Sequence, residues 1–167
     1  MKIRLTILAA LISSLLFSQS KPIYLSQTKI GFLNCSVQQI NQHNQKNPDL
    51  FVTIEFKNEG TQANTGSISF DLQNDSAGIA SFIADLNKAI TLVDNGTDQA
   101  WNNTGYLVKI FDVSATIHLY EPESKGGSNT EIIKRDAQRL VTWLESTLKN
   151  RSKFLHQQNN HKGMAGL

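Results

Sequence analysis

The stretches DSAGIASFIADL (75–86) and DAQRLVTWLEST (136–147) lie 61 residues apart and share one pattern of polar and apolar residues. Each begins with an aspartate, has an aliphatic residue four positions later, and then carries an aromatic residue followed by an aliphatic one. Apolar residues at three- and four-residue spacing predict a helix with one apolar face. The sequence therefore predicts two similar amphipathic helices, each of which needs a surface to cover.

Three segments before the first helix have the character of β-strands. They are IGFLNCSVQQI (30–40), LFVTIEF (50–56) and SISFDLQ (67–73). In the last two, apolar residues alternate with others, which places one face of a strand on a core and the other toward water. The polar segments 42–49 and 57–67 are predicted as connecting loops, because they are rich in turn-forming residues.

The second half of the chain repeats this order. GYLVKIFDV (105–113), ATIHLYE (115–121) and TEII (130–133) are predicted as strands, and a helical period begins at Lys134. The segment 122–129 contains two adjacent glycines and reads as a turn. Both halves thus have the predicted order βββα.

These elements predict an α+β fold in which one antiparallel sheet has two helices on one face. The domain is expected over 21–155, as two related βββα halves at about 21–98 and 99–155. The alternative is chance, since any two amphipathic helices look alike over twelve residues; the shared aspartate, apolar positions and preceding strand favour duplication. The segment 156–167 is polar and without periodicity, and is predicted to be a disordered tail.

The first twenty residues have the features of a cleaved signal peptide. Lys2 and Arg4 precede an apolar run over 7–17, and small or polar residues follow at 18–20. A run of this length is too short to span a bilayer as a helix, which takes about 20 residues. We expect export to the periplasm or the extracellular space and no transmembrane span in the mature protein; a buried N-terminal helix is the alternative.

Charge and cysteine content limit the classes of partner and of scaffold. Residues 21–167 contain fourteen basic and fourteen acidic residues, so the net charge of the mature chain gives no reason to expect nucleic acid. Cys35 is the only cysteine and cannot form an intramolecular disulfide. We expect it to be buried; a disulfide between two chains is the alternative.

The sequence contains none of the common catalytic or cofactor motifs. G-x-S-x-G, H-E-x-x-H, paired C-x-x-C and phosphate-binding glycine loops are all absent. The carboxylate pairs Glu121/Glu123 and Asp94/Asp98 lie in predicted turns, where acidic residues are common. We therefore expect no cofactor, no metal site and no assignable catalytic residue, which favours a protein that is not an enzyme.

Four aromatic residues are candidates for ligand binding. Trp101 lies in a polar loop, where it either plugs the end of a core or awaits a ligand such as a sugar ring. Tyr106 and Tyr120 are placed on strands, as is His118, which is either a structural residue or a general base.

The C-terminal part of the chain is basic. Residues 134–167 contain seven basic and two acidic residues. Arg135, Arg139, Lys149 and Lys153 recur at helical spacing, on the side predicted to lie opposite the apolar face of the second helix. Such a stripe fits an acidic protein or an anionic surface; the alternative is a solvated helix face.

These observations favour an exported, non-enzymatic binding or accessory module. The first alternative is a small secreted or periplasmic hydrolase without a recognisable motif. A whirly- or PUR-like nucleic-acid-binding module ranks third. Those modules also build sheets from repeated strands followed by a helix, but no shared motif can be quoted and an exported protein rarely meets nucleic acid.

Overall fold

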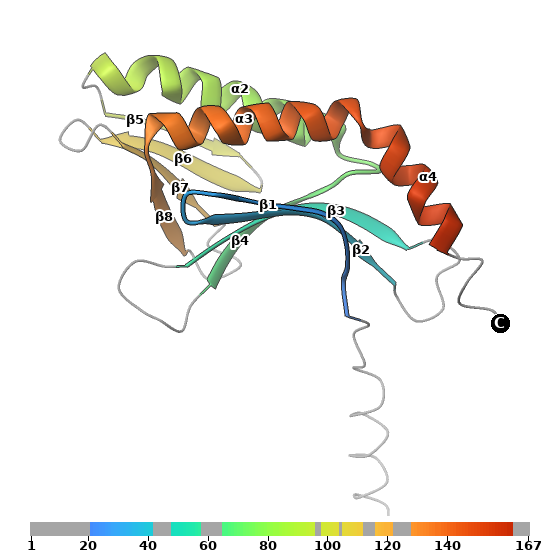
Figure 1. Ribbon diagram of the computed structural model, residues 1–167. Helices are drawn as coiled ribbons and strands as arrows, with labels where there is room; N and C mark the ends of the chain where they lie inside the picture. Colours follow the sequence, from blue (N-terminus) through green and yellow to red (C-terminus); the bar gives the residue numbers. More distant parts are fainter. Residues whose placement is uncertain are drawn as a thin grey trace, which may run out of the picture.

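The protein has an α+β fold of two antiparallel sheets and a layer of helices (Figure 1). The computed structural model describes residues 21–41, 48–57, 65–95, 98–103, 105–111, 116–121 and 128–161. Within these ranges, none of the helices combines the length and apolarity needed to cross a membrane. The predicted signal peptide lies outside the described residues.

The first sheet is a four-stranded antiparallel meander in which sequence order equals spatial order. Its strands are β1 (Ile23–Ile30), β2 (Leu33–Ile40), β3 (Asp49–Lys57) and β4 (Thr65–Asp71). The predicted alternation is confirmed, since the side chains of Val52, Ile54 and Ile68 are fully buried. Phe51 and Ser69, on the opposite face, are partly exposed.

Helix α2 (Ser76–Leu92) follows β4 after a short turn and ends in the 3₁₀ turn η1 (Val93–Asn95). Asp75 caps its N-terminus, because the Asp75 carboxylate accepts a hydrogen bond from the Gly78 backbone N–H at 2.9 Å. Ile79, Phe82 and Leu86 are fully buried, as the helical period predicts.

The second sheet is also a four-stranded antiparallel meander. Its strands are β5 (Gln99–Asn103), β6 (Tyr106–Phe111), β7 (Thr116–Tyr120) and β8 (Asn129–Ile132). Two helices follow, α3 (Lys134–Lys149) and α4 (Arg151–His161), with a break at Asn150.

The structure corrects the predicted architecture in three respects. There are two sheets rather than one, and each half of the chain contributes four strands rather than the three predicted. The additional strands are β1 and β5. Only Ile30 of β1 and no residue of β5 is buried, so neither strand has a clear apolar alternation in the sequence. The predicted tail also begins too early, because α4 continues to His161.

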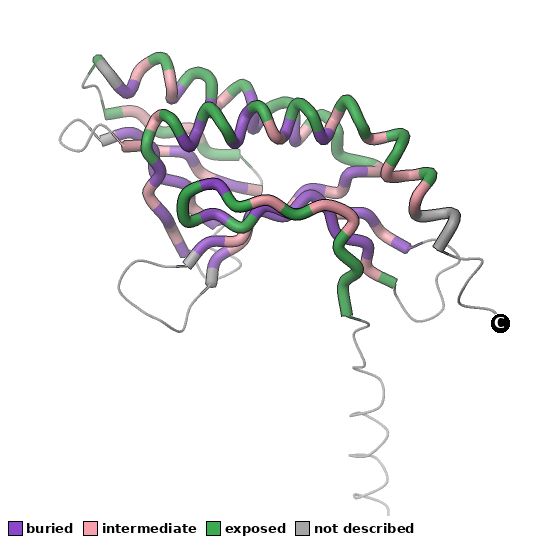
Figure 2. The backbone as a smooth tube through the Cα atoms, viewed as in Figure 1, coloured by how far each residue is buried: buried purple, intermediate pink, exposed green. Residues whose placement is uncertain are grey.

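The helices form one layer that bridges both sheets. Figure 1 shows α2 and α3 side by side; α2 contacts β4 and β6, and α3 contacts β1 and β7. The buried residues of both helices lie on the sides that face the sheets (Figure 2). The resulting core is continuous from the first sheet to the second.

An aromatic cluster joins the two sheets through α2. The ring of Phe82 on α2 lies 5.4 Å from that of Phe70 on β4 and 4.5 Å from that of Tyr106 on β6, between ring centroids. Phe70 and Tyr106 meet edge to face at 6.0 Å. Aromatic pairs at these separations contribute about 0.5–1.5 kcal/mol beyond the area that they bury.

Candidate functional site

The four predicted ligand-binding residues lie on opposite faces of the second sheet. Trp101 pairs with Val108, so it faces α2 together with Tyr106. His118 and Tyr120 alternate with buried Leu119 and therefore point away from α2. The structure forms two separate pairs and not a single site.

Tyr106 is a structural residue of the core. It is 2% exposed, and its hydroxyl donates a hydrogen bond to the Asp85 carboxylate at 2.7 Å and accepts one from the Asn103 amide at 3.1 Å. Burial, reinforced by the hydrogen bond to Asp85, raises the pKa of Tyr106 far above its ordinary value. A side chain held in this way is not available to a ligand.

Trp101 packs against the edge of the core and is partly buried. The ammonium group of Lys88, on α2, lies 4.4 Å from the centroid of its ring, within the range of a cation–π interaction. This placement agrees with an aromatic that closes the end of a core.

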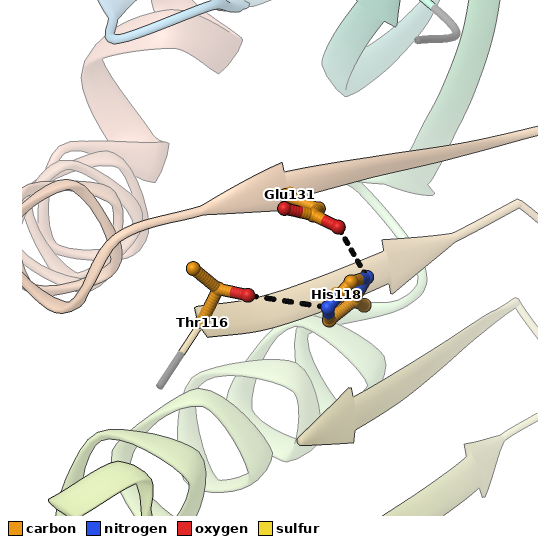
Figure 3. A network of polar contacts seen from close by, with 3 residues as sticks. All are labelled: Thr116, His118 and Glu131. Atoms are coloured by element: carbon orange, nitrogen blue, oxygen red, sulfur yellow. Dashed lines mark hydrogen bonds and ion pairs between the residues drawn. The ribbon is translucent and has the colours of Figure 1, made fainter. Parts of the chain in front are cut away.

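His118 lies in a polar cluster on the other face of the second sheet (Figure 3). Its Nδ1 is 3.4 Å from Oε1 of Glu131, the residue opposite it on β8, and its Nε2 is 3.2 Å from Oγ1 of Thr116. The order carboxylate, imidazole, hydroxyl is also the order of a catalytic triad. The His118 side chain is only 9% exposed, however, whereas that of Glu131 is 41% exposed.

Tyr120 adjoins this cluster. Its ring stacks with that of His118 at 6.5 Å, and the Lys109 ammonium lies 4.8 Å from its centroid. Burial, with the negative charge of Glu131 as the second cause, raises the pKa of Tyr120. The ring of Tyr120 serves as a packing surface for His118 and Lys109.

A hollow with a volume of about 470 Å³ lies between β1 and α3. Thr28 and Ile30 form its lower wall on β1, and the exposed side of α3 forms its upper wall. The α3 residues that line it are Arg135, Gln138, Arg139, Thr142, Trp143 and Ser146.

A second hollow, of about 290 Å³, adjoins the first toward α4. The two share Trp143 and Ser146, so they form one continuous groove along β1, which we call the β1–α3 groove. Figure 1 shows α3 above β1, with α4 turning away beyond the end of α3. The further residues of the second hollow are Leu25, Ser26, Thr147, Asn150, Lys153, Phe154 and Gln157.

Three of the four predicted basic residues line this groove. Arg135, Arg139 and Lys153 are exposed there, whereas Lys149 is exposed on α3 but lines neither hollow. Asp136 lies 3.8 Å from Nε of Arg135 and 3.6 Å from Nη1 of Arg139, so one carboxylate faces two guanidinium groups. No lining residue of either hollow is acidic, and the groove therefore keeps a net positive charge.

Sequence reasoning found the basic wall of the groove and missed the opposite wall. Helical spacing was sufficient for Arg135 and Arg139, whereas β1 was not predicted as a strand. Trp143 was assigned to the buried face; it is half-buried and lies where the two hollows meet.

Two further findings concern metal binding and similarity to known proteins. Within the described part of the chain, no group of three or more His, Cys, Asp or Glu side chains is placed to hold a metal ion. No family model, curated protein or solved structure matches the chain.

Proposed function

We propose that this protein is an exported, non-enzymatic binding or accessory module that holds its partner in the β1–α3 groove. The observation that carries the proposal is the pair of adjoining hollows along β1, with Arg135, Arg139 and Lys153 at their walls. Trp143 supplies an apolar surface where the hollows meet, and Trp and Arg are the residues most enriched at the energetic centres of protein interfaces.

The chemistry of the groove favours binding over catalysis. Its hydroxyl groups belong to serine and threonine residues such as Thr28, Thr142 and Ser146. Its lining residues include no His, Asp, Glu or Cys. A hydroxyl without a base beside it is a weak nucleophile. The groove can therefore recognise charge and shape but has no group suited to proton transfer at neutral pH.

Site-specific photocrosslinking in the extracytoplasmic fraction of the host tests this proposal. A photoreactive residue replaces Thr142 inside the groove; the matched control replaces Asn87, which is exposed on α2. We expect one discrete crosslinked partner from position 142 and none from position 87. The same products from both positions, or no product from 142, would contradict the groove as the binding site.

Export is tested separately by the N-terminus of the protein recovered from its host. Cleavage after Ser20 gives a chain that begins at Lys21 and is found outside the cytoplasm. A full-length chain in the cytoplasm would overturn this part of the proposal and leave the groove unaffected.

We also infer that the two halves derive from one duplicated unit. Each half has four antiparallel strands followed by a helix, and three pairs of helix positions 61 residues apart are buried in both: Ile79/Leu140, Ile83/Leu144 and Leu86/Thr147. The shared aspartates give no support, because Asp75 caps α2 whereas Asp136 lies inside α3. Backbone superposition of 23–92 on 99–149 tests the inference; a common path for fewer than three strands would contradict it.

The second candidate is a hydrolase centred on His118. The Thr116–His118–Glu131 contacts favour it, because they place a base beside a hydroxyl and a carboxylate beside the base. Thr116→Val and His118→Ala would each abolish turnover of p-nitrophenyl acetate, or of peptide and glycoside substrates, if this candidate holds. Under the binding proposal the purified protein shows no turnover that these variants remove.

A further inference from the structure

The outer edge of β1 is open toward the groove. β1 is the terminal strand of the first sheet and pairs only with β2, so the backbone groups that face away from β2 have no partner strand among the described residues. An exposed row of N–H and C=O groups is a template for another strand. The β-bulge between Tyr24 and Ser26 interrupts the edge at one end, which leaves Ser26–Ile30 as its regular part.

The length of this regular edge matches the first hollow. Arg135 and Ser146 delimit the α3 wall and are about 16 Å apart along the helix axis, at 1.5 Å per residue. An extended chain covers that distance with about five residues. The five residues Ser26–Ile30 therefore offer an edge as long as the wall that stands over it.

The charges around the groove select the partner. Arg135, Arg139 and Lys153 line it, and the one carboxylate beside the two arginines, that of Asp136, leaves an excess of positive charge. β1 contains no acidic residue, so pairing of two copies through β1 would bring lysines together with no compensating carboxylate. An acidic strand meets opposite charge on the helical wall of the groove, at Arg135, Arg139 and Lys153.

We infer that the groove takes an extended acidic segment of a partner protein, which adds as a fifth strand to β1 beneath α3. The backbone of the segment bonds to the free edge of Ser26–Ile30. Its carboxylates meet Arg135 and Arg139, and an apolar side chain reaches Trp143. The inference rests on the proposed binding function of the groove and gives it a class of partner.

Selection from a random octapeptide library displayed on phage tests the partner class with the whole protein as bait. We expect selected sequences rich in Asp and Glu and poor in Pro, because proline removes the N–H that a ladder needs. The double variant Arg135→Glu/Arg139→Glu should lower the affinity for a selected peptide by about tenfold or more. Lys149→Glu reverses one charge on α3 outside the groove, half the charge change of the double variant, and should leave affinity within about twofold.

Amide hydrogen exchange tests the binding mode. A synthetic selected peptide should slow exchange at the β1 amides that face away from β2, and methylation of alternate peptide nitrogens should abolish both the protection and the binding. The β6 and β7 amides serve as internal controls, since those strands lie in the second sheet.

Each other outcome overturns the inference in a distinct way. Binding that survives N-methylation without protection of β1 would mean docking by charge alone. Selection of basic or neutral peptides, or an equal effect of Lys149→Glu, would exclude the acidic class. Absence of selected peptides, with β1 protected in a dimer, would assign the edge to a second copy; binding to anionic lipid vesicles instead would assign it to a membrane. A crosslink from position 142 in any of these cases preserves the groove as a binding site.

Discussion

Gly31 lies in the two-residue turn between β1 and β2. Its φ is +58°, in the left-handed region of backbone conformation that residues other than glycine seldom adopt. A Cβ at this position would also lie 2.5 Å from Oδ2 of Asp136, at the start of α3. We expect Gly31→Ala to lower the free energy of unfolding by about 1–3 kcal/mol, measured by urea denaturation. Gly105→Ala is the matched control, because a Cβ there contacts nothing; equal losses in the two variants would contradict the assignment of strain to Gly31.

The reactivity of the Cys35 thiol is determined by its burial. Its side chain is buried, as the sequence predicted, and burial raises its pKa from 9.0 to about 12. Near pH 8 the native thiol therefore carries almost no thiolate, the form that reacts. We expect native protein to react with a thiol reagent at least 100-fold more slowly than protein in concentrated urea, with Cys35→Ser as the blank. Rapid labelling of the native chain would show an accessible thiol and contradict the burial of Cys35.

At the scale of elements, prediction succeeded where a segment has one buried face. β3 and β4 alternate clearly, and α2 and α3 have apolar stripes that the core buries. β1 and β5 could not be read in this way, because backbone pairing rather than side-chain burial holds them in their sheets. The four-stranded halves depend on such long-range pairing, which local patterns do not record.

Arg151 ties the start of helix α4 to the segment that follows β4. Nε of Arg151 donates a hydrogen bond to the Leu72 carbonyl at 2.7 Å, and Nη2 donates one to the Gln73 carbonyl, beyond the end of β4. Hydrogen bonds of charged donors contribute about 1.5–3 kcal/mol each when removed. We expect Arg151→Met to destabilise the protein by about 2 kcal/mol and to speed amide exchange in α4, while Lys153→Met does neither. Equal effects of the two variants would show that α4 is attached by other contacts.

At the scale of the whole molecule, the groove shows the limit of local reasoning. One wall comes from β1, near residue 28, and the other from α3, more than 100 residues later. The basic spacing on α3 was visible in the sequence, but its position over an open strand edge follows only from the packing of α3 across the first sheet. From the sequence alone, the basic residues of α3 could face solvent or any acidic partner. The structure places them beside the edge strand β1.

Tyr106 connects the two sheets and α2, so its titration affects the whole fold. Its folded pKa is raised above the ordinary value of 10.0, first by burial and then by the hydrogen bond to Asp85. A raised pKa contributes stability that is complete below pH 10 and is lost as pH rises toward the folded pKa, by about 1.4 kcal/mol per pH unit. Asp85 is only partly buried, so Tyr106→Phe should cost about 1 kcal/mol near pH 8.

The two stability curves should therefore converge above pH 10 and meet at about pH 11, beyond which the variant is the more stable protein. Urea denaturation of wild type and variant at each pH measures the difference directly. All other side chains are the same in both proteins, so the difference isolates Tyr106. A gap that stays constant from pH 8 to pH 11 would show that Tyr106 ionises equally in the folded and unfolded chains. Its hydroxyl would then not be held by burial and Asp85, and the aromatic cluster would owe its stability to packing alone.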